Sequence, residues 1–535
     1  MKKYFFSFII FIVSILNFNC KENINNSTTY TISTTISGNG NIIPNGNVNV
    51  KENANQKFTF TANNGYYVDS IIIDENYIAD SLSSYTFYNV TSNHIIKVVF
   101  AQMPSQISYS NHIQKIFNRS CATSGCHNSI SNSANLNLSS WENVMNGSNL
   151  GAVVIPFRSD KSLVVNLFEG ISLRKNHPQI EKPIHSYEIE FLKMWINDGT
   201  KNDNGEIPFT NSIHKVYVPN QNDDEVAVID IDKMLITRFI KVGNKSILES
   251  PHFIVAKGNY WYVSLINSGE IWKFDSRNDS LIGTVEIDGS PALLALTPDG
   301  NKLYVSQFMI GDIKKIFVVN TNTMTVTNQI TVGNMPHGIR MNNAGTKLYV
   351  ANMMSDNISV IDVASDDVIA TIPLAYDVPP IGTSNYQPME IAVSPNDELI
   401  AVTCSKKNEV RTFQTSDYTL KDSFSVGNEP WHLQFSQNGD YIYVTNRLGN
   451  SLSAIHTQMI GHIQTVTNPS LFDYPHGCDV SENYIFVSNE NTSHNFIPKY
   501  NLEFIGNLLV INKSTLQIEK HIEVGKMPTG ISVLK

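Results

Sequence analysis

IYVTN at residues 442–446 is the clearest member of a set of short apolar stretches that recur along this chain. The other members are VYVPN, WYVSL, LYVSQ, LYVAN, LIAVT and IFVSN. Their second residues lie 42–51 positions apart and are Tyr217, Tyr262, Tyr304, Tyr349, Ile400, Tyr443 and Phe486. A period of this length, with about four short strands per unit, is typical of β-propeller blades. The seven stretches therefore predict a seven-bladed propeller over residues 212–535.

Other segments recur in step with these strands. Apolar stretches of the type VAVID, ISVID and LLVIN follow them, and strands ending in Val-Gly follow in turn as KVGN, TVGN, SVGN and EVGK. Together these segments resemble the YVTN-type propellers, and IYVTN contains the motif for which those repeats are named. The resemblance implies that each blade consists of four antiparallel strands.

The two ends of the repeat array predict how the ring closes. A proline begins a strand in each unit, at Pro251, Pro291, Pro336, Pro388, Pro430, Pro475 and Pro528. The first blade starts directly with VYVPN and lacks such a strand, whereas GISVLK follows Pro528 after the last blade. We therefore expect the C-terminal strand to pair beside Val216–Pro219, which would close the ring and remove its open edges.

The residue after each of these prolines is expected to approach the mouth of the central channel. These residues are His252, Ala292, His337, Met389, Trp431, His476 and Thr529. Histidine is the commonest transition-metal ligand, so His252, His337 and His476 are candidates for a metal or cofactor site. The alternative is a structural or weak-binding role, because a seven-bladed channel tends to hold such side chains too far apart for one ion.

A second motif lies upstream of the repeats, where residues 121–127 read CATSGCH. Two cysteines followed at once by a histidine are how a chain attaches haem c: the thiols bond the haem vinyl groups and the imidazole ligates the iron. The spacing here is C-x4-C-H, two residues longer than the common form. The motif predicts one covalent haem c on Cys121 and Cys126, with His127 as the proximal ligand.

Helices are expected on both sides of this loop, within residues 104–204. Before the cysteines, apolar residues fall at i, i+3 and i+4, at Ile113, Ile116 and Phe117. In SYEIEFLKMWINDG, Ser186 is the expected N-cap and Gly199 the expected end. The buried stripe of this helix would be Ile189, Leu192, Trp195 and Ile196. These segments, with LNLSSWENVMNG and VVIPFRSDKSLVV, resemble the single-haem cytochrome c domains of bacterial lipoproteins, which implies a small all-α domain.

Two other interpretations of the cysteine loop are a zinc site and a simple disulfide. Zinc prefers four protein ligands in structural sites, and no third cysteine or paired histidine lies nearby in the sequence. In the resembled family a Met-Pro pair supplies the second axial ligand, and the matching place here reads LRKNHPQ. His177 is therefore the candidate distal ligand, with His185 and Met194 as alternatives. Two imidazole ligands would favour ferric iron.

The N-terminus reads as an export signal. Residues 1–20, MKKYFFSFIIFIVSILNFNC, combine two lysines, a short apolar run and a cysteine. We expect a lipoprotein signal peptide with lipidation at Cys20, the alternative being an ordinary cleaved signal. The mature protein would be exported and anchored on the periplasmic or cell-surface side, with the outer membrane as the expected site.

Composition argues against a nucleic-acid partner and against a framework of disulfides. The formal net charge is −10, only 16% of residues are charged, and no basic cluster occurs, which argues against nucleic-acid binding. The remaining cysteines, Cys404 and Cys478, lie in apolar stretches and are expected to be buried free thiols.

Residues 30–101 form the remaining segment. Period-two alternation with Gly and Asn turns predicts short strands. NGYYVDSIIID and YTFYNVTSNHIIKVVF resemble the divergent internalin-type B-repeat, which implies a spacer or adhesive module.

The fold class expected is thus a multidomain, mainly β protein: a β-rich repeat domain, a small all-α cytochrome c domain and a seven-bladed propeller. The expected function is electron transfer to or from a redox partner protein or a small-molecule donor or acceptor, with the propeller binding a protein or ligand. One alternative is a haem-dependent oxidoreductase with a metal or cofactor in the propeller channel. Another is a surface binding or adhesion protein whose haem domain is structural.

Overall fold

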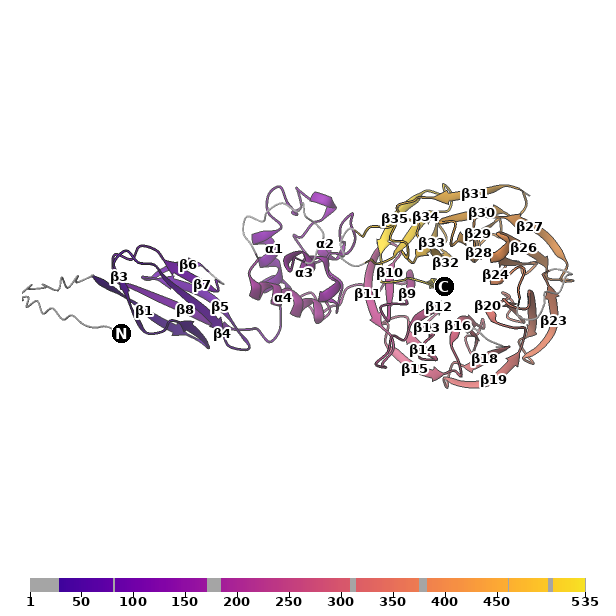
Figure 1. Ribbon diagram of the computed structural model, residues 1–535, viewed down its shortest axis with the longest axis horizontal. Helices are drawn as coiled ribbons and strands as arrows, with labels where there is room; N and C mark the ends of the chain where they lie inside the picture. Colours follow the sequence, from indigo (N-terminus) through magenta and orange to yellow (C-terminus); the bar gives the residue numbers. More distant parts are fainter. Residues whose placement is uncertain are drawn as a thin grey trace, which may run out of the picture. The chain divides into compact units, whose positions relative to one another are not determined.

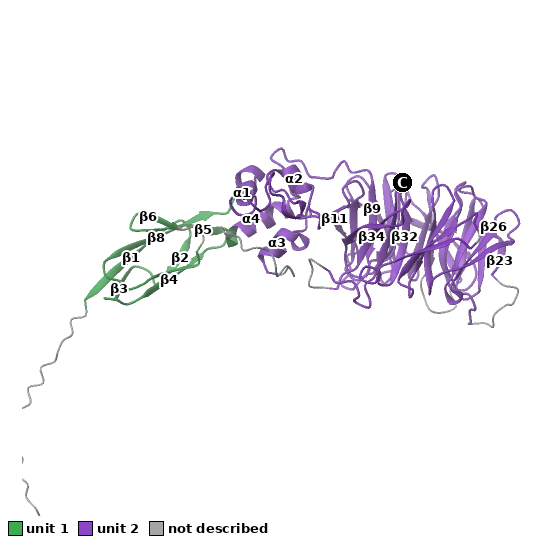
Figure 2. Ribbon diagram, turned by 90° about the horizontal axis from the view of Figure 1, so that it is seen from above, with its two compact units in different colours: residues 1–105, 185–187 green, residues 106–184, 188–535 purple. Residues whose placement is uncertain are grey.

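The computed structural model describes residues 28–79, 82–170, 184–307, 314–374, 383–459, 461–498 and 504–534. Most of the regular structure is β-strand, and the chain divides into two compact units (Figure 2). One unit comprises residues 1–105 with 185–187, and the other comprises residues 106–184 with 188–535. No helix among the described residues is long and apolar enough to cross a bilayer.

The first unit contains two small sheets. One has the order β3-β1-β8-β5-β6 and the other β2-β4-β7. The strands are β1 (Thr29–Ser37), β2 (Gly40–Ile43), β3 (Asn47–Lys51), β4 (Gln56–Ala62), β5 (Tyr66–Ile73), β6 (Asn76–Ala79), β7 (Ser84–Phe87) and β8 (His94–Gln102). Alternate residues of these strands form one core around Ile32, Phe58 and Ile71, as the period-two pattern predicts.

Short helices occur between residues 109 and 197, in the second unit except for the first two residues of the last helix. They are a π-helical turn (Tyr109–Ile113), α1 (Gln114–Ser120), α2 (Trp141–Met145), α3 (Leu163–Phe168) and α4 (Ser186–Asn197), with single 3-10 turns at Ser133–Asn135 and Ser159–Lys161. The expected apolar stripe before the cysteines is buried, since Ile113, Ile116 and Phe117 are at most 3% exposed. Gly199 follows α4 with a φ of 95° and donates its N–H to the carbonyl of Ile196, as a helix-ending glycine does.

The buried face of α4 differs from the expected one. Leu192, Trp195 and Ile196 are buried as predicted, but Ile189 is only half-buried, and Phe191 takes its place in the core. The Phe191 ring packs edge-on against His112 at a centroid separation of 5.5 Å. An ion pair between the buried Glu188 and the half-buried Arg119 lies on the same side of the helix. Because α4 contacts His112 and Arg119, its buried face is rotated toward Phe191 and Glu188. Ser186 is the first helical residue and not the residue preceding the helix.

Residues 215–534 form seven four-stranded antiparallel sheets arranged as a ring (Figure 1). Blade 1 contains β9 (Lys215–Asn220), β10 (Glu225–Asp230) and β11 (Leu235–Lys241). Blades 2–4 contain β12 (Pro251–Lys257), β13 (Tyr260–Leu265), β14 (Glu270–Asp275) and β15 (Leu281–Glu286); β16 (Pro291–Leu296), β17 (Lys302–Gln307), β18 (Lys315–Asn320) and β19 (Thr325–Thr331); and β20 (Pro336–Met341), β21 (Lys347–Asn352), β22 (Asn357–Asp362) and β23 (Asp367–Pro373).

Blades 5–7 continue the ring with the same strand order. They contain β24 (Pro388–Val393), β25 (Leu399–Cys404), β26 (Glu409–Gln414) and β27 (Leu420–Ser425), with a 3-10 turn at Ser405–Lys407; β28 (Pro430–Phe435), β29 (Tyr441–Asn446), β30 (Ser451–His456) and β31 (Ile463–Thr467); and β32 (Pro475–Val480), β33 (Tyr484–Asn489), β34 (Asn507–Asn512) and β35 (Ile518–Glu523). The proline-led strands are innermost, as Figure 1 shows for β12, β16, β20, β24, β28 and β32.

The ring closes as the sequence predicts. The C-terminal strand β36 (Ser532–Val533) pairs antiparallel with β9, placing Ser532 opposite Tyr217 and Val533 opposite Val216. It becomes the innermost strand of blade 1, so the first and last segments of the propeller share one sheet. This arrangement leaves no unpaired inner edge at the junction.

The recurring YVTN positions have separate structural roles. The tyrosine reaches the following blade: the Tyr304 hydroxyl donates to Asp366 at 2.5 Å, and that of Tyr217 lies 3.3 Å from Asp279. The asparagine is buried and donates across its own blade, as Asn446 does to Ser451 and Ser453. A Cβ at Gly427 of the Val-Gly pair would lie 2.5 Å from Asn446, so glycine is needed there.

A Ser or Thr of the motif strand links five of the blades to the next one; it is the fourth residue of the quoted stretch in four blades and Thr403, the fifth residue of LIAVT, in blade 5. The Ser or Thr hydroxyl donates to the carbonyl of the residue that follows the next proline. These pairs are Ser264 with Ala292, Ser306 with His337, Thr403 with Trp431, Thr445 with His476, and Ser488 with Thr529. Because the same hydroxyls also accept an N–H from the inner strand of their own blade, they fix the inner strands against one another.

Candidate functional site

The residues that follow the prolines lie at the start of the inner strands, and several of them contact one another. Six of the seven are buried, and Trp431 is half-buried. The His252 and His476 rings are 5.2 Å apart between centroids, and Trp431 lies 5.8 Å from His476 and 6.4 Å from His337. The structure therefore brings the three predicted histidines to one place, with the rings of His252 and His476 in contact.

His476 is held by a carboxylate on one side and an indole on the other. Its Nδ1 lies 2.8 Å from Glu490 Oε1, and its Nε2 lies 3.2 Å from Trp431 Nε1. The indole can only donate, so Nε2 accepts and Nδ1–H donates to the carboxylate. Burial alone would raise the pKa of Glu490, but the hydrogen bonds and charges of His476 and Arg447 lower it to about 2. Glu490 is therefore an ionised anchor for both side chains.

The other two histidines are also anchored through Nδ1. His252 Nδ1 lies 3.0 Å from Gln221 Oε1, and His337 Nδ1 lies 2.8 Å from the carbonyl of Met389. Burial lowers the pKa of His252 well below its usual range and that of His337 to about 4, so both rings are neutral at pH 7. Across the described ranges, no group of three or more His, Cys, Asp or Glu residues is placed to hold a metal ion.

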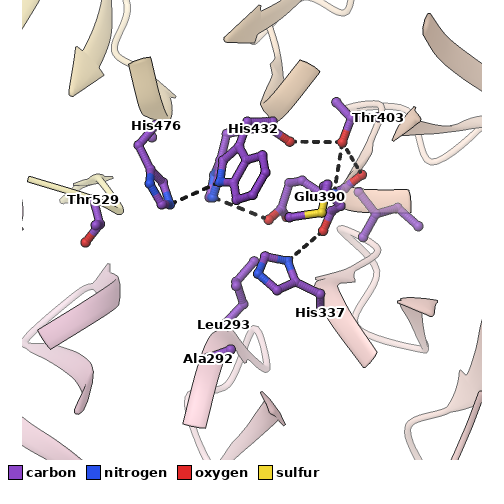
Figure 3. Close-up of polar contacts among 12 residues, drawn as sticks. Ala292, Leu293, His337, Glu390, Thr403, His432, His476 and Thr529 are labelled. Atoms are coloured by element: carbon purple, nitrogen blue, oxygen red, sulfur yellow. Dashed lines mark hydrogen bonds and ion pairs between the residues drawn. The ribbon is translucent and has the colours of Figure 1, made fainter. Parts of the chain in front are cut away.

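A carboxyl and an imidazole on the inner strands of blades 5 and 6 face one another (Figure 3). Glu390 is fully buried, and His432 is 3% exposed. His432 Nε2 lies 3.8 Å from Glu390 Oε2, and Arg340 lies 3.5 Å from Oε1 on the other side. Burial raises the pKa of Glu390 to about 7, although the charge of Arg340 opposes this rise. Burial, with smaller contributions from neighbouring histidines and Arg340, lowers the pKa of His432 well below its usual range.

A cavity of about 230 Å³ adjoins this pair, lined by the inner strands of every blade but the fifth. Its polar residues include Arg340, His432, Gln434 and Asp479, and its apolar residues include Phe253. The rings of Phe253 and His432 stack across the channel at 5.7 Å. Glu390 does not line the cavity but lies behind His432 and Arg340.

Sequence reasoning selected the position directly after each proline and missed the next ones along the strand. Glu390 and His432 stand two residues after Pro388 and Pro430, where blades 4 and 7 have glycine, and Arg340 stands four residues after Pro336. The pairing register shifts after each proline, as between Pro388 and Ile391. Departure from glycine at an aligned inner-strand position is the signal that could have identified Glu390 and His432.

The CATSGCH loop follows α1 directly. The Cys121 N–H donates to the carbonyl of Phe117, and the N–H of His127 returns to the carbonyl of Cys121 at 3.1 Å. Cys121 is buried and Cys126 half-buried, and both thiols are free, so the structure contains no disulfide between them. Burial raises the pKa of the Cys121 thiol to about 12. The loop thus places two reduced thiols and one imidazole within a single hydrogen-bonded turn.

The other residues singled out in the sequence are the remaining cysteines and the candidate distal ligands. Cys404 and Cys478 are buried free thiols, as predicted. His177, the candidate distal ligand, and Cys20 with the rest of residues 1–20 lie outside the described residues. Of the alternatives, His185 is half-buried and stacks on Tyr187 at 5.8 Å, and Met194 is half-buried within α4.

Comparison with known proteins concerns the propeller. The sequence profile of the lactonase family, described as a 7-bladed β-propeller, matches residues 277–368. A 6-phosphogluconolactonase from Yersinia pestis is 24% identical over 202 residues, which is 36% of this chain and 58% of that protein. The seven-bladed β-propeller protein Rv1057 of Mycobacterium tuberculosis is 29% identical over 167 residues, which is 30% of this chain and 39% of that protein. The chain thus spans less than two thirds of the length of either relative.

Two solved structures also align with part of this chain. Hydrazine synthase of Kuenenia stuttgartiensis aligns with a TM-score of 0.41 and 18% identity, over 53% of this chain and 98% of that one. Streptogramin B lyase aligns with a TM-score of 0.43 and 14% identity, over 59% and 91% of the two chains. The C-terminal region is a seven-bladed β-propeller, and over residues 277–368 its sequence is similar to the lactonase-type propellers.

Proposed function

We propose that this protein is an exported haem c electron carrier, with the haem held by Cys121, Cys126 and His127. The observation that supports it is the loop geometry: two free thiols and the following imidazole share one turn whose backbone returns to its own start. Cys121 and Cys126 would bind the group through their Sγ atoms, and His127 through its ring. When bound, haem c would supply reversible one-electron transfer.

The surrounding chain would hold this loop rigidly. Phe117 is fully buried, and its carbonyl accepts the N–H of Cys121. The ion pair between the half-buried Arg119 and the buried Glu188 joins the last turn of α1 to α4. Because the loop is fixed at its first residue, the two thiols would keep their positions relative to each other. A lipid on Cys20 would tether the protein to a membrane, and the electron partner would be a redox protein or a small-molecule donor or acceptor.

The test is a reduced-minus-oxidised absorption spectrum of the protein produced in a host that matures haem c. The wild-type chain is expected to show reversible one-electron reduction, and the double variant C121S/C126S is expected to show none. The matched control is Cys404→Ala, which removes a buried thiol from the propeller and should leave the spectrum unchanged. A wild-type protein without the spectral change would refute the proposal.

We propose hydrolysis of a lactone in the propeller channel as a second candidate function. One support is that the Yersinia relative carries the name of a lactonase. The other is the buried pair: burial raises the pKa of Glu390 to about 7, into the neutral range, and a neutral imidazole lies 3.8 Å away. Such a pair can give or take a proton near pH 7. Glu390 and His432 would then be the proton-transferring residues beside the cavity.

Hydrolysis can be tested on purified protein with a panel of simple lactones, following acid release at constant pH. We expect turnover by the wild-type chain and a loss of at least tenfold in Glu390→Gln, which keeps the shape but cannot exchange a proton. Glu398→Gln, an exposed glutamate of the same blade, is the matched control. Absence of turnover in the wild type, or full activity in Glu390→Gln, would remove this candidate.

A further inference from the structure

The cavity in the propeller channel has chemically different sides. Blades 1–3 contribute mainly apolar side chains to it, namely Phe253, Ile254, Leu294, Leu296 and Ile531, with Lys257 and Ser532 as polar exceptions. Blades 4, 6 and 7 contribute Arg340, His432, Gln434 and Asp479. Because propeller blades follow one another around the ring, these two sets face each other across the channel. Such a cavity suits a small molecule with an apolar body and one polar end.

Arg340 is the charged group on the polar side. Its Nε donates to the carbonyl of Ile391 at 3.3 Å, which fixes the guanidinium, and its side chain is 31% exposed. The contact with Glu390 is 3.5 Å, longer than the 2.7–2.9 Å typical of a charge-assisted hydrogen bond. Within the part of the chain that the structure describes, Arg340 Nη1 has no hydrogen bond. The guanidinium therefore retains N–H groups for a ligand.

Asp479, the acidic residue that lines the cavity, accepts hydrogen bonds from groups other than Arg340. Asp479 Oδ1 accepts from Gln434 Nε2 at 2.9 Å and from the N–H of Val480, and Oδ2 accepts from the N–H of Val533 at 2.8 Å. These bonds hold Asp479 against its own strand and against β36. Asp479 therefore does not neutralise Arg340 by direct pairing.

The formal charges of the lining residues indicate the charge of the ligand. Arg340 and Lys257 are positive and Asp479 is negative, so the lining carries a formal net charge of about +1 at pH 7, which Glu390 behind Arg340 lowers to the extent that it is ionised. A monoanion would balance this charge, whereas a dianion such as phosphate would meet repulsion from Asp479. A carboxylate also matches the planar fork of an arginine.

We propose that this cavity binds a small monocarboxylate, with Arg340 holding the carboxylate and the side chains of blades 1–3 covering the apolar body. The volume of about 230 Å³ accommodates one aromatic or short aliphatic acid. The proposal requires neither haem attachment nor hydrolysis, because it depends only on the cavity and on Arg340.

The experiment measures benzoate binding to the full-length protein by titration calorimetry. Wild-type protein is expected to bind benzoate, and Arg340→Gln is expected to weaken binding at least tenfold. Arg277→Gln is the matched control, because Arg277 has 70% of its side chain exposed, pairs with Asp275 and does not line the cavity. The control variant should bind as the wild type does.

Two further ligands make the outcome decisive. Benzamide, a neutral molecule of nearly the same shape, should bind the wild type at least tenfold more weakly than benzoate, and inorganic phosphate should not displace benzoate. If Arg340→Gln fails to fold, the comparison of benzoate with benzamide on the wild type decides alone. No benzoate binding, equal binding of benzamide, or unchanged affinity in a folded Arg340→Gln would overturn the proposal. Repeating the titration on C121S/C126S protein separates this result from that of haem attachment.

Discussion

His337 Nδ1 lies 2.8 Å from the carbonyl oxygen of Met389, at a place that a hydroxyl group occupies between other blades. In blades 3 and 6 the fourth residue of the motif supplies that hydroxyl. Ser306 donates to the backbone carbonyl of His337 at 2.6 Å, and Thr445 donates to the backbone carbonyl of His476 at 2.8 Å. Blade 4 has Ala351 at this position and cannot supply one. The imidazole of His337 replaces the missing hydroxyl, which explains this histidine without a metal.

The substitution of hydroxyl by imidazole predicts a rescue. His337→Ala should lower the free energy of unfolding by about 1–3 kcal/mol, because it leaves the buried Met389 carbonyl without its donor. Adding Ala351→Ser should restore about 1 kcal/mol or more, since a serine at this position in blade 3 reaches the equivalent carbonyl. Urea unfolding of the propeller measures both changes. As the control, Ala351→Ser alone should change the free energy of unfolding little. If His337→Ala and the double variant are equally stable, this role for His337 is contradicted.

Gly338, the glycine after His337, is expected to resist substitution. A Cβ at this position would lie 2.7 Å from the Glu390 Cα and 2.7 Å from the Met389 carbonyl oxygen, and both are backbone atoms. Gly338→Ala must therefore push two inner strands apart and should cost about 3 kcal/mol of folding stability. Gly283→Ala is the matched control, because its Cβ would meet only the flexible Met324 side chain, at 3.2 Å. The melting temperature of Gly338→Ala should be clearly lower than that of Gly283→Ala. Equal melting temperatures would show that the inner strands move apart at little cost.

Glu390 predicts an unusual dependence of stability on pH. Its pKa is raised by burial to about 7, above the usual 4.5, so the folded state holds this proton more tightly than the unfolded state. Stability should therefore fall as pH rises from about 4.5 to about 7, by about 3 kcal/mol in total. Glu390→Gln cannot ionise and should lack this fall.

The measurement is urea unfolding of wild type and Glu390→Gln at several pH values between 4 and 8. The difference between the two proteins isolates Glu390, because every other titrating group is shared. Glu490, whose pKa is lowered to about 2, acts in the opposite sense: its contribution is lost as pH falls below about 4.5. Glu398→Gln should follow the wild-type profile, and a parallel profile for Glu390→Gln would show that Glu390 is not the group responsible.

The repeat spacing was sufficient to predict the architecture of the propeller. Blade number, the innermost proline-led strands and the pairing of the C-terminal strand with Val216 all follow from it, because each blade repeats the same strand lengths. The CATSGCH loop shows the limit of such reasoning. The spacing of Cys121, Cys126 and His127 predicts a chemistry, and the structure adds that both thiols are free and that the turn is closed by hydrogen bonds.

The channel chemistry could not be predicted in the same way. Glu390, His432 and Arg340 come from three different blades, and only the closure of the ring brings them together. The pairing shift after each proline also changes which residue faces the channel, so counting from the proline selected the histidines at the start of the inner strands. In α4, one-face periodicity selected Ile189 where the structure buries Phe191, because the position of the π-helical turn with His112 is not contained in the helix sequence.

The most direct test of the proposed function is the mass of the peptide that contains residues 121–127, released by proteolysis from protein exported by a host that matures haem c. Covalent attachment predicts that this peptide carries the full added mass of one haem in the wild type, and that C121S/C126S lacks it. A wild-type peptide of unmodified mass, from a host shown to attach haem to a control cytochrome, would contradict the electron-carrier proposal.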